Sequence, residues 1–100
     1  MQCIDDLYVG ASVSDLGTVL YSLRRNIPMI RVYCIVWFAN KNRMVLLSSK
    51  ELFSGRYDKQ NPIIAGVAMG KQESIDVLCY MLEETVKAKR DITNPKMWIL

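Results

Sequence analysis

The stretch Met29–Phe38, which reads Met-Ile-Arg-Val-Tyr-Cys-Ile-Val-Trp-Phe, decides the fold predicted for this chain. Nine of its ten residues are apolar or aromatic, with Arg31 as the exception. Its β-branched and aromatic side chains favour a strand. Alternation places Ile30, Val32, Cys34, Val36 and Phe38 on one face, and Met29, Arg31, Tyr33, Ile35 and Trp37 on the other. Because both rows are mostly apolar, both faces of the strand need to be covered. This favours a role in an interface over a role in a catalytic site.

Length and composition predict one globular domain. A chain of 100 residues is too short to bury two cores. Its 51% hydrophobic and 23% charged residues are typical of an ordered chain rather than a disordered one. The longest apolar run, residues 32–39, is far shorter than the roughly 20 residues of a membrane helix. The first residues are acidic where a signal peptide is basic, so we expect a cytoplasmic protein without membrane contact.

The residue inventory argues against an enzyme. The chain has no histidine, which excludes Ser-His-Asp and Cys-His catalysis within it and histidine zinc sites. Cys3, Cys34 and Cys79 are widely spaced and include no Cys-x-x-Cys, which favours reduced thiols. Cys34 and Cys79 lie in apolar sequence and are expected to act as small core residues. No acid and base residues converge in the sequence, so we expect no catalytic residue, no metal site and no cofactor.

Charge is unevenly distributed along the chain. Residues 1–23 carry three acidic side chains and no basic one, whereas residues 24–59 carry eight basic and two acidic side chains. The middle segment is therefore a candidate electropositive surface. With Tyr33 and Trp37 available for stacking, it offers a nucleic-acid hypothesis. The candidate residues are Arg24, Arg25, Arg31, Lys41, Arg43, Arg56 and Lys59. A net charge of +3 is modest for such a function, and solvated surface charge is the alternative.

Hydrophobic periodicity predicts two helices. Leu16, Val19, Leu20 and Leu23 share one helical face, capped by Ser12 or Ser14, which predicts a helix over about 13–25. A longer helix over about 72–90 carries a second apolar stripe. Its expected members are Ile75, Leu78, Cys79, Leu82 and Val86, widened by Val77 and Met81.

Three strands are predicted, over about 29–38, 43–48 and 62–69. Asn40-Lys41-Asn42 supplies a tight turn between the first two. Ser48 and Ser49 are expected to cap a short helical turn over residues 50–54, and residues 97–100 are expected to form an apolar C-terminal tail. The N-terminal ten residues are ambiguous between a short strand and a packed terminus. We therefore predict an α+β domain in α-β-β-β-α order, with a three-stranded antiparallel sheet and both helices packed on one face.

The sheet face left open in this arrangement is the leading candidate site. Its aromatic, Met and Arg residues are typical of an interface core. The partner would be a second copy or another protein, and the C-terminal tail either joins the interface or folds back over the same face. The predicted interface comprises Met29, Arg31, Tyr33, Ile35, Trp37, Met97, Trp98, Ile99 and Leu100.

A glycine-containing turn offers a third hypothesis. Gly66, Gly70 and Lys71 lie between a predicted strand and the start of a helix. A helix N-terminus beside a lysine can bind an anion or a nucleotide. The spacing is not that of a Walker loop, since three residues separate the glycines and Gln72 follows Lys71. The alternative is that Gly66 eases packing and Gly70 turns the chain.

The segment Ile63–Leu82 resembles small uncharacterised proteins carried by Firmicutes genomes, prophages and mobile elements. This resemblance covers about a fifth of the chain, and it implies a small accessory protein that acts on a host factor. The leading hypothesis is thus a non-catalytic interaction module that self-associates and modulates or inhibits a macromolecular partner. Nucleic-acid binding through residues 24–59, and anion or nucleotide binding at Gly70-Lys71, remain alternatives.

Overall fold

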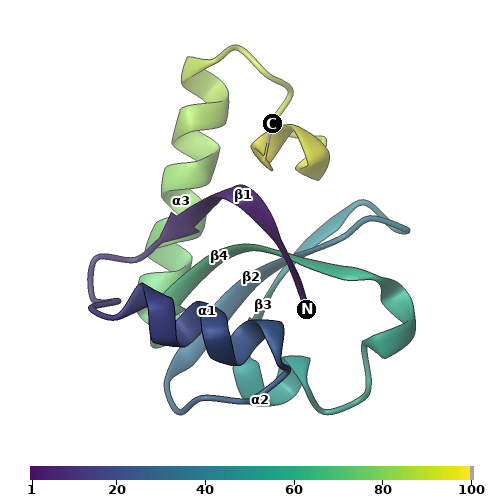
Figure 1. The fold of residues 1–100 in the computed structure, drawn as a ribbon. Helices are drawn as coiled ribbons and strands as arrows, with labels where there is room; N and C mark the ends of the chain where they lie inside the picture. The colour runs from purple at the N-terminus through teal and green to yellow at the C-terminus, as the bar shows by residue number, and fades with distance from the viewer. Residues whose placement is uncertain (100) are drawn as a thin grey trace.

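The computed structural model describes residues 1–99, which form a sheet flanked by helices (Figure 1). The strands are β1 (Gln2–Val9), β2 (Val32–Phe38), β3 (Arg43–Ser48) and β4 (Pro62–Met69). The helices are α1 (Leu16–Arg24), α2 (Ser49–Leu52) and α3 (Lys71–Lys87), with the 3-10 turns η1 (Asp58–Gln60) and η2 (Pro95–Ile99). The predicted α+β class is therefore correct in its coarse form.

The sheet has four strands in the order β1-β4-β2-β3, so the predicted three-stranded antiparallel sheet is wrong. β2 pairs antiparallel with both β3 and β4, whereas β1 pairs parallel with β4. The element order begins with a strand that the sequence left ambiguous. The pairing register of β1 with β4 shifts between Cys3 and Tyr8, and the acidic middle of β1 is exposed. The sequence of β1 therefore shows neither the regular alternation nor the continuous apolar run that is typical of a strand.

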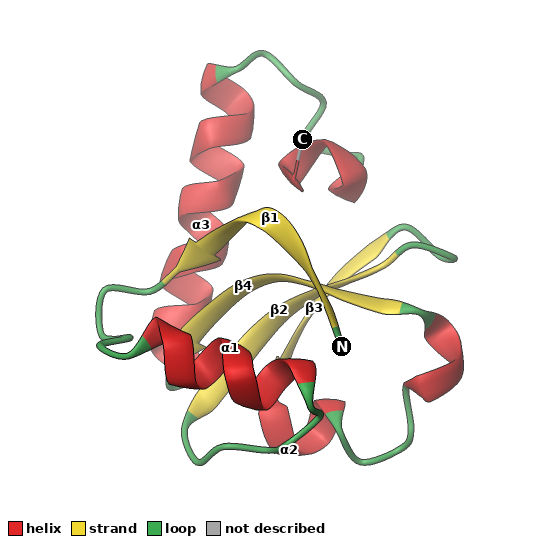
Figure 2. Cartoon of the chain, in the orientation of Figure 1, coloured by secondary structure: helices red, strands yellow, loops and turns green. Residues whose placement is uncertain are grey.

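The helices cover opposite faces of the sheet, not one face as predicted (Figure 2). On one face, Val19 and Leu23 of α1 and Leu52 of α2 pack against Val32, Cys34, Val36 and Phe38 of β2. On the other face, Met81 of α3 packs against Ile35 and Ala65. β2 is apolar on both sides, and burying both rows stabilises the fold more than leaving one in water.

β2 begins at Val32, three residues later than predicted. Arg31 has a φ of 68°, which turns its backbone out of the extended region. Ile30 consequently leaves the predicted apolar row and is 90% exposed. The predicted strands at 43–48 and 62–69 match β3 and β4.

α1 begins at Leu16, because Asp15 caps it instead of Ser12 or Ser14. One Asp15 carboxylate oxygen accepts a 3.1 Å hydrogen bond from the Thr18 backbone N–H. Residues 13–15 therefore precede the helix, and Arg25 is its C-terminal cap. At the other helix, α3 spans Lys71–Lys87 rather than 72–90.

The buried face of α3 is rotated from the predicted stripe: Val77, Leu78 and Met81 pack in the core as expected, whereas Cys79 and Val86 do not. Ser74, Met81 and Thr85 are its buried residues, while Val86 is 57% exposed and Cys79 is exposed. The Thr85 hydroxyl donates a 2.8 Å hydrogen bond to the Met81 carbonyl, and the Ser74 hydroxyl donates one of 2.5 Å to that of Lys71. Two polar residues can be buried here because each satisfies its hydroxyl within the helix.

The C-terminal tail folds back beside α3 as η2 (Figure 1). Trp98 and Ile99 pack against the cluster formed by Ile35, Ala65 and Met81. Asn42, in the turn between β2 and β3, holds the tail, since its Oδ1 accepts hydrogen bonds of 3.0 Å from both Trp37 Nε1 and the Lys96 backbone N–H. The tail thus covers part of the sheet face that was predicted to be open.

Candidate functional site

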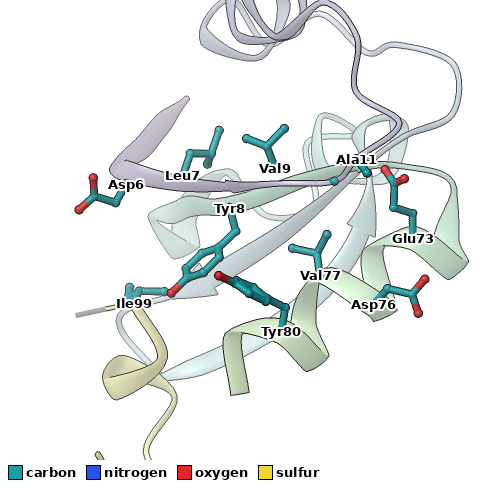
Figure 3. Close-up of a pocket in the computed structure, with 11 residues that line it drawn as sticks. Asp6, Leu7, Tyr8, Val9, Ala11, Glu73, Asp76, Val77, Tyr80 and Ile99 are labelled. Carbon is teal, nitrogen blue, oxygen red and sulfur yellow. The ribbon is translucent and has the colours of Figure 1, made fainter. Parts of the chain in front are cut away.

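Two hollows border α3, and the larger one lies between α3 and β1 (Figure 3). It has a volume of about 800 Å³. The side chains of Tyr8 and Tyr80 meet edge to face across it, with ring centroids 6.0 Å apart. Asp6, Glu73 and Asp76 also line it, and the described lining residues include no lysine or arginine. This hollow is therefore electronegative.

The Glu73 carboxylate links α3 to two other segments of the backbone, so it is not free to bind a ligand. Its two side-chain oxygens accept hydrogen bonds from the backbone N–H groups of Ser12 at 3.0 Å and Met69 at 2.9 Å. The Met69 bond, followed by those from Ser12, holds the pKa of this carboxyl below its usual value. A carboxylate that is kept ionised and already accepts two hydrogen bonds is a poor general acid, so Glu73 has a structural role at this hollow.

The second hollow lies at the N-terminal end of α3, where β2 begins and β3 ends. It has a volume of about 590 Å³. Three basic side chains line it together with aromatic and aliphatic ones. We call it the basic pocket, and its lining residues are Pro28, Met29, Ile30, Arg31, Tyr33, Ser48, Lys50, Gly70 and Lys71.

The loop Pro28–Arg31 that forms one wall of the basic pocket is held at both ends. The buried Ser49 hydroxyl accepts a 2.9 Å hydrogen bond from the Met29 N–H and donates one of 2.8 Å to the Met29 carbonyl. At the other end, the Gly70 N–H donates a 2.7 Å bond to the Arg31 carbonyl. Ile30 is therefore fixed in an exposed position between two clamped residues.

Arg31 carries backbone strain at this site. A φ of 68° places it in the left-handed region, which costs a residue with a Cβ about 1–3 kcal/mol. Asparagine occupies three of the four other positive-φ non-glycine positions among residues 1–99, and it tolerates that region better than arginine does. Backbone strain of this kind clusters at ligand-binding sites, and here it lies beside an isoleucine that is 90% exposed, which favours a binding role for this loop.

The basic pocket gathers residues that the sequence assigned to two separate sites. Met29, Arg31 and Tyr33 belonged to the predicted partner interface, and Gly70 and Lys71 to the predicted anion site. Ile30 and Lys50 join them although no sequence pattern marked either residue. The sequence could have identified Ile30 as an exposed residue only if it had shown that β2 begins at Val32.

The remaining predicted interface residues lie elsewhere. Ile35 is fully buried beneath α3, and Trp37 is half-buried with its indole N–H bonded to Asn42. Trp98 and Ile99 pack in the same cluster as Ile35, and Met97 is half-buried in η2. Leu100 lies outside the described residues.

Gly66 is separated from Gly70 and Lys71 by three residues of β4, where it has a packing role. A Cβ at Gly66 would lie 3.0 Å from the Ile35 Cδ1 and 3.2 Å from the Tyr8 carbonyl oxygen. Gly70, in contrast, precedes α3 with a φ of 88° and open space around it. The structure thus keeps Gly70 and Lys71 together and leaves Gly66 in the sheet.

The seven basic residues proposed for nucleic acid are spread over several elements. Lys41 and Arg43 share one hollow with the segment that contains Arg56 and Lys59. Arg31 precedes β2, whereas Lys41 and Arg43 follow it, and a strand of seven residues separates them by about 20 Å. Arg25 stacks over the Tyr21 ring at 3.6 Å beside Arg24 at the end of α1. Arg56 and Lys59 are exposed in the segment before β4.

The cysteines divide by environment. Cys34 is buried, and its burial raises the pKa of the thiol to about 12, with a smaller contribution from nearby Cys3. Cys79 is exposed, so the expectation of two core cysteines is correct for Cys34 and wrong for Cys79. Within residues 1–99, no cluster of three or more His, Cys, Asp or Glu side chains is placed to hold a metal ion.

Comparison of the chain with protein-family models, with curated proteins and with solved structures finds no match in any of the three. Among the helices of residues 1–99, none has the length and apolar character needed to cross a membrane.

Proposed function

We propose that this chain is a non-catalytic interaction module that binds a protein partner through the basic pocket. The partner would present an apolar side chain flanked by carboxylates, and binding would block or recruit it. The observation that carries the proposal is Ile30, which is 90% exposed on a loop clamped at Met29 and Arg31. A rigid exposed apolar side chain loses little conformational entropy when a partner covers it.

The charges around Ile30 specify the partner's chemistry. Arg31, Lys50 and Lys71 line the pocket, and its described lining has no acidic side chain. Cations at the rim steer an acidic partner and exclude a basic one, while the apolar contact supplies affinity. Nucleic acid fits this pocket less well, because its three basic side chains share the lining with Pro28, Met29 and Ile30, which offer no hydrogen bond to a phosphate backbone from their side chains.

The test uses two pools of random twelve-residue peptides. One contains acidic and aliphatic residues, and the other replaces the acidic residues by lysine. We expect the immobilised protein to enrich peptides from the acidic pool only. Ile30→Ser should weaken the selected peptide at least tenfold, which is the effect of a central contact residue. The matched control Ile92→Ser alters an isoleucine that is 46% exposed outside the pocket, and should change affinity less than twofold.

Charge reversal at the pocket provides a second readout. Lys71→Glu should weaken the acidic peptide and reduce the salt dependence of its binding, whereas Lys96→Glu, outside the pocket, should change neither. Enrichment of the lysine pool, or full affinity after Ile30→Ser, would overturn the proposal. Binding of a mixed-sequence single-stranded oligonucleotide with a steep salt dependence and no effect of Ile30→Ser would identify a nucleic-acid binder instead.

A further inference from the structure

β3 is the last strand of the sheet, and its outer edge is open. It pairs with β2 on one side and has no strand on the other. Within residues 1–99, no loop or side chain hydrogen bonds to the outward backbone groups of residues 43–47. An open strand edge is a template for pairing with another strand.

The two sheet edges differ in how they are protected. At the β1 edge, Asp5 and Asp6 are exposed and the register with β4 shifts between Cys3 and Tyr8. Exposed charge and irregular pairing both discourage the addition of a strand. β3 has regular pairing along all six residues, and Arg43 is its one charged residue. Met44, Val45 and Leu46 follow it and are half-buried. β3 therefore lacks the exposed acidic pair and the irregular pairing that protect the β1 edge.

Positive charge flanks β3 at both ends. Exposed Lys41 and Arg43 lie at its beginning, and the basic pocket with Lys50 lies at its end, because Ser48 lines that pocket. Glu51, the acidic residue nearby, has its Oε1 held by the Ser48 N–H and hydroxyl. In a two-fold pair of copies, antiparallel β3 strands would bring each basic beginning against a basic end. Like charges in contact disfavour a second copy and favour an acidic occupant.

We infer that the partner's acidic segment binds in extended form along β3 as a fifth strand of the sheet, with one end in the basic pocket. This inference rests on the proposed function and specifies how the partner binds. Six residues of β3 give a pairing length of about 20 Å. Backbone hydrogen bonds would supply affinity, and the segment's carboxylates would face Arg43 at one end and Lys50 at the other.

The test is a backbone N-methyl scan of the selected acidic peptide. In an added strand, alternate N–H groups point toward β3 and the others point to solvent. Methylation of one alternate set should therefore weaken binding at least tenfold, and methylation of the other set less than threefold. Amide hydrogen exchange within Arg43–Leu47 should slow on binding, while exchange within β1 stays unchanged.

The outcomes separate this inference from the proposed function. If both N-methyl sets bind equally well while Ile30→Ser still weakens the peptide, the added strand is overturned and the pocket function stands. If no acidic peptide binds, both are overturned. If light scattering shows a dimer whose slow β3 exchange is lost on dilution, the edge belongs to a second copy and the inference is overturned.

Discussion

The backbone N–H of Gly70 donates a 2.7 Å hydrogen bond to the carbonyl oxygen of Arg31. Both residues have positive φ, 88° for Gly70 and 68° for Arg31. The bond joins the loop before β2 to the start of α3, two places that are far apart in sequence. At this contact, a residue of the predicted partner interface meets a residue of the predicted anion site, and both line the basic pocket.

The strain at Arg31 predicts effects of different size on stability for two substitutions. Arg31→Gly relieves the left-handed strain but gives the unfolded chain more freedom, so the free energy of unfolding should change by less than about 1 kcal/mol. Arg31→Val puts a β-branched side chain in the same conformation and should lower it by about 1–3 kcal/mol. Urea unfolding of both variants provides the measurement. Equal stability of the two would show that the backbone there is not strained.

Ser49 is predicted to stabilise the binding loop. It is fully buried, and Ser49→Ala would leave the Met29 N–H without its partner, while the Met29 carbonyl would keep only its 3.3 Å hydrogen bond from the Val32 N–H. The free energy of unfolding should fall by about 1–3 kcal/mol. Ser54→Ala is the control, because the exposed Ser54 hydroxyl only donates to the Glu51 carbonyl, and its effect should stay below about 0.5 kcal/mol. Equal losses in the two variants, measured by urea unfolding, would contradict this role.

Gly66 and Gly17 should respond oppositely to alanine. At Gly66 the added Cβ would be 3.0 Å from Ile35 Cδ1 and 3.2 Å from a backbone oxygen, so Gly66→Ala should destabilise by about 1–3 kcal/mol. At Gly17, within α1, the nearest atom is 3.6 Å away, so Gly17→Ala should stabilise by about 0.5–1 kcal/mol. Thermal unfolding midpoints test the signs. A stable Gly66→Ala variant would mean that Ile35 and Tyr8 can move apart.

Glu73 predicts a pH-dependent contribution to stability. Hydrogen bonds from the Met69 and Ser12 N–H groups lower its pKa in the folded state from the ordinary 4.5. The stabilisation is therefore fully present above pH 4.5 and is lost as the pH falls through the folded-state pKa. Glu73→Gln removes this contribution, so the stability gap between wild type and variant should shrink with acidification. Urea midpoints from pH 7 to pH 3 provide the measurement, and a constant gap would contradict the assignment.

Asn42 should control how firmly the tail is docked. Its φ of 48° suits glycine, so Asn42→Gly keeps the backbone but removes the acceptor shared by Trp37 Nε1 and the Lys96 N–H. Losing these bonds should cost about 1–2 kcal/mol and speed amide exchange in η2. Exchange in α1, on the opposite face, should stay slow. The Lys96 N–H would keep its 3.3 Å hydrogen bond to the Asn94 Oδ1. Unchanged exchange throughout η2 would therefore show that Asn42 does not hold the tail.

The sequence by itself determined the local elements that strong patterns encode. Alternating and continuous apolar runs located β2, β3 and β4, and helical periodicity located α1 and α3, because these patterns reflect which side chains must leave water. The two-sided apolar character of β2 also required cover on both faces. Both faces of β2 are indeed buried, but the prediction that both helices pack on one face of the sheet was wrong.

Tertiary structure decided everything that depends on contacts between distant segments. β1 is held by parallel pairing with β4, so its mixed local pattern could not reveal it. The burial of Ser74 and Thr85 instead of Val86 depends on how α3 is rotated against Ala65 and Ile35. The basic pocket exists because the antiparallel pairing of β2 with β4, which the Gly70–Arg31 bond extends, brings together residues about 40 apart in sequence. Sequence periodicity reports burial along one element, whereas a site is a relation between elements that only the packed fold creates.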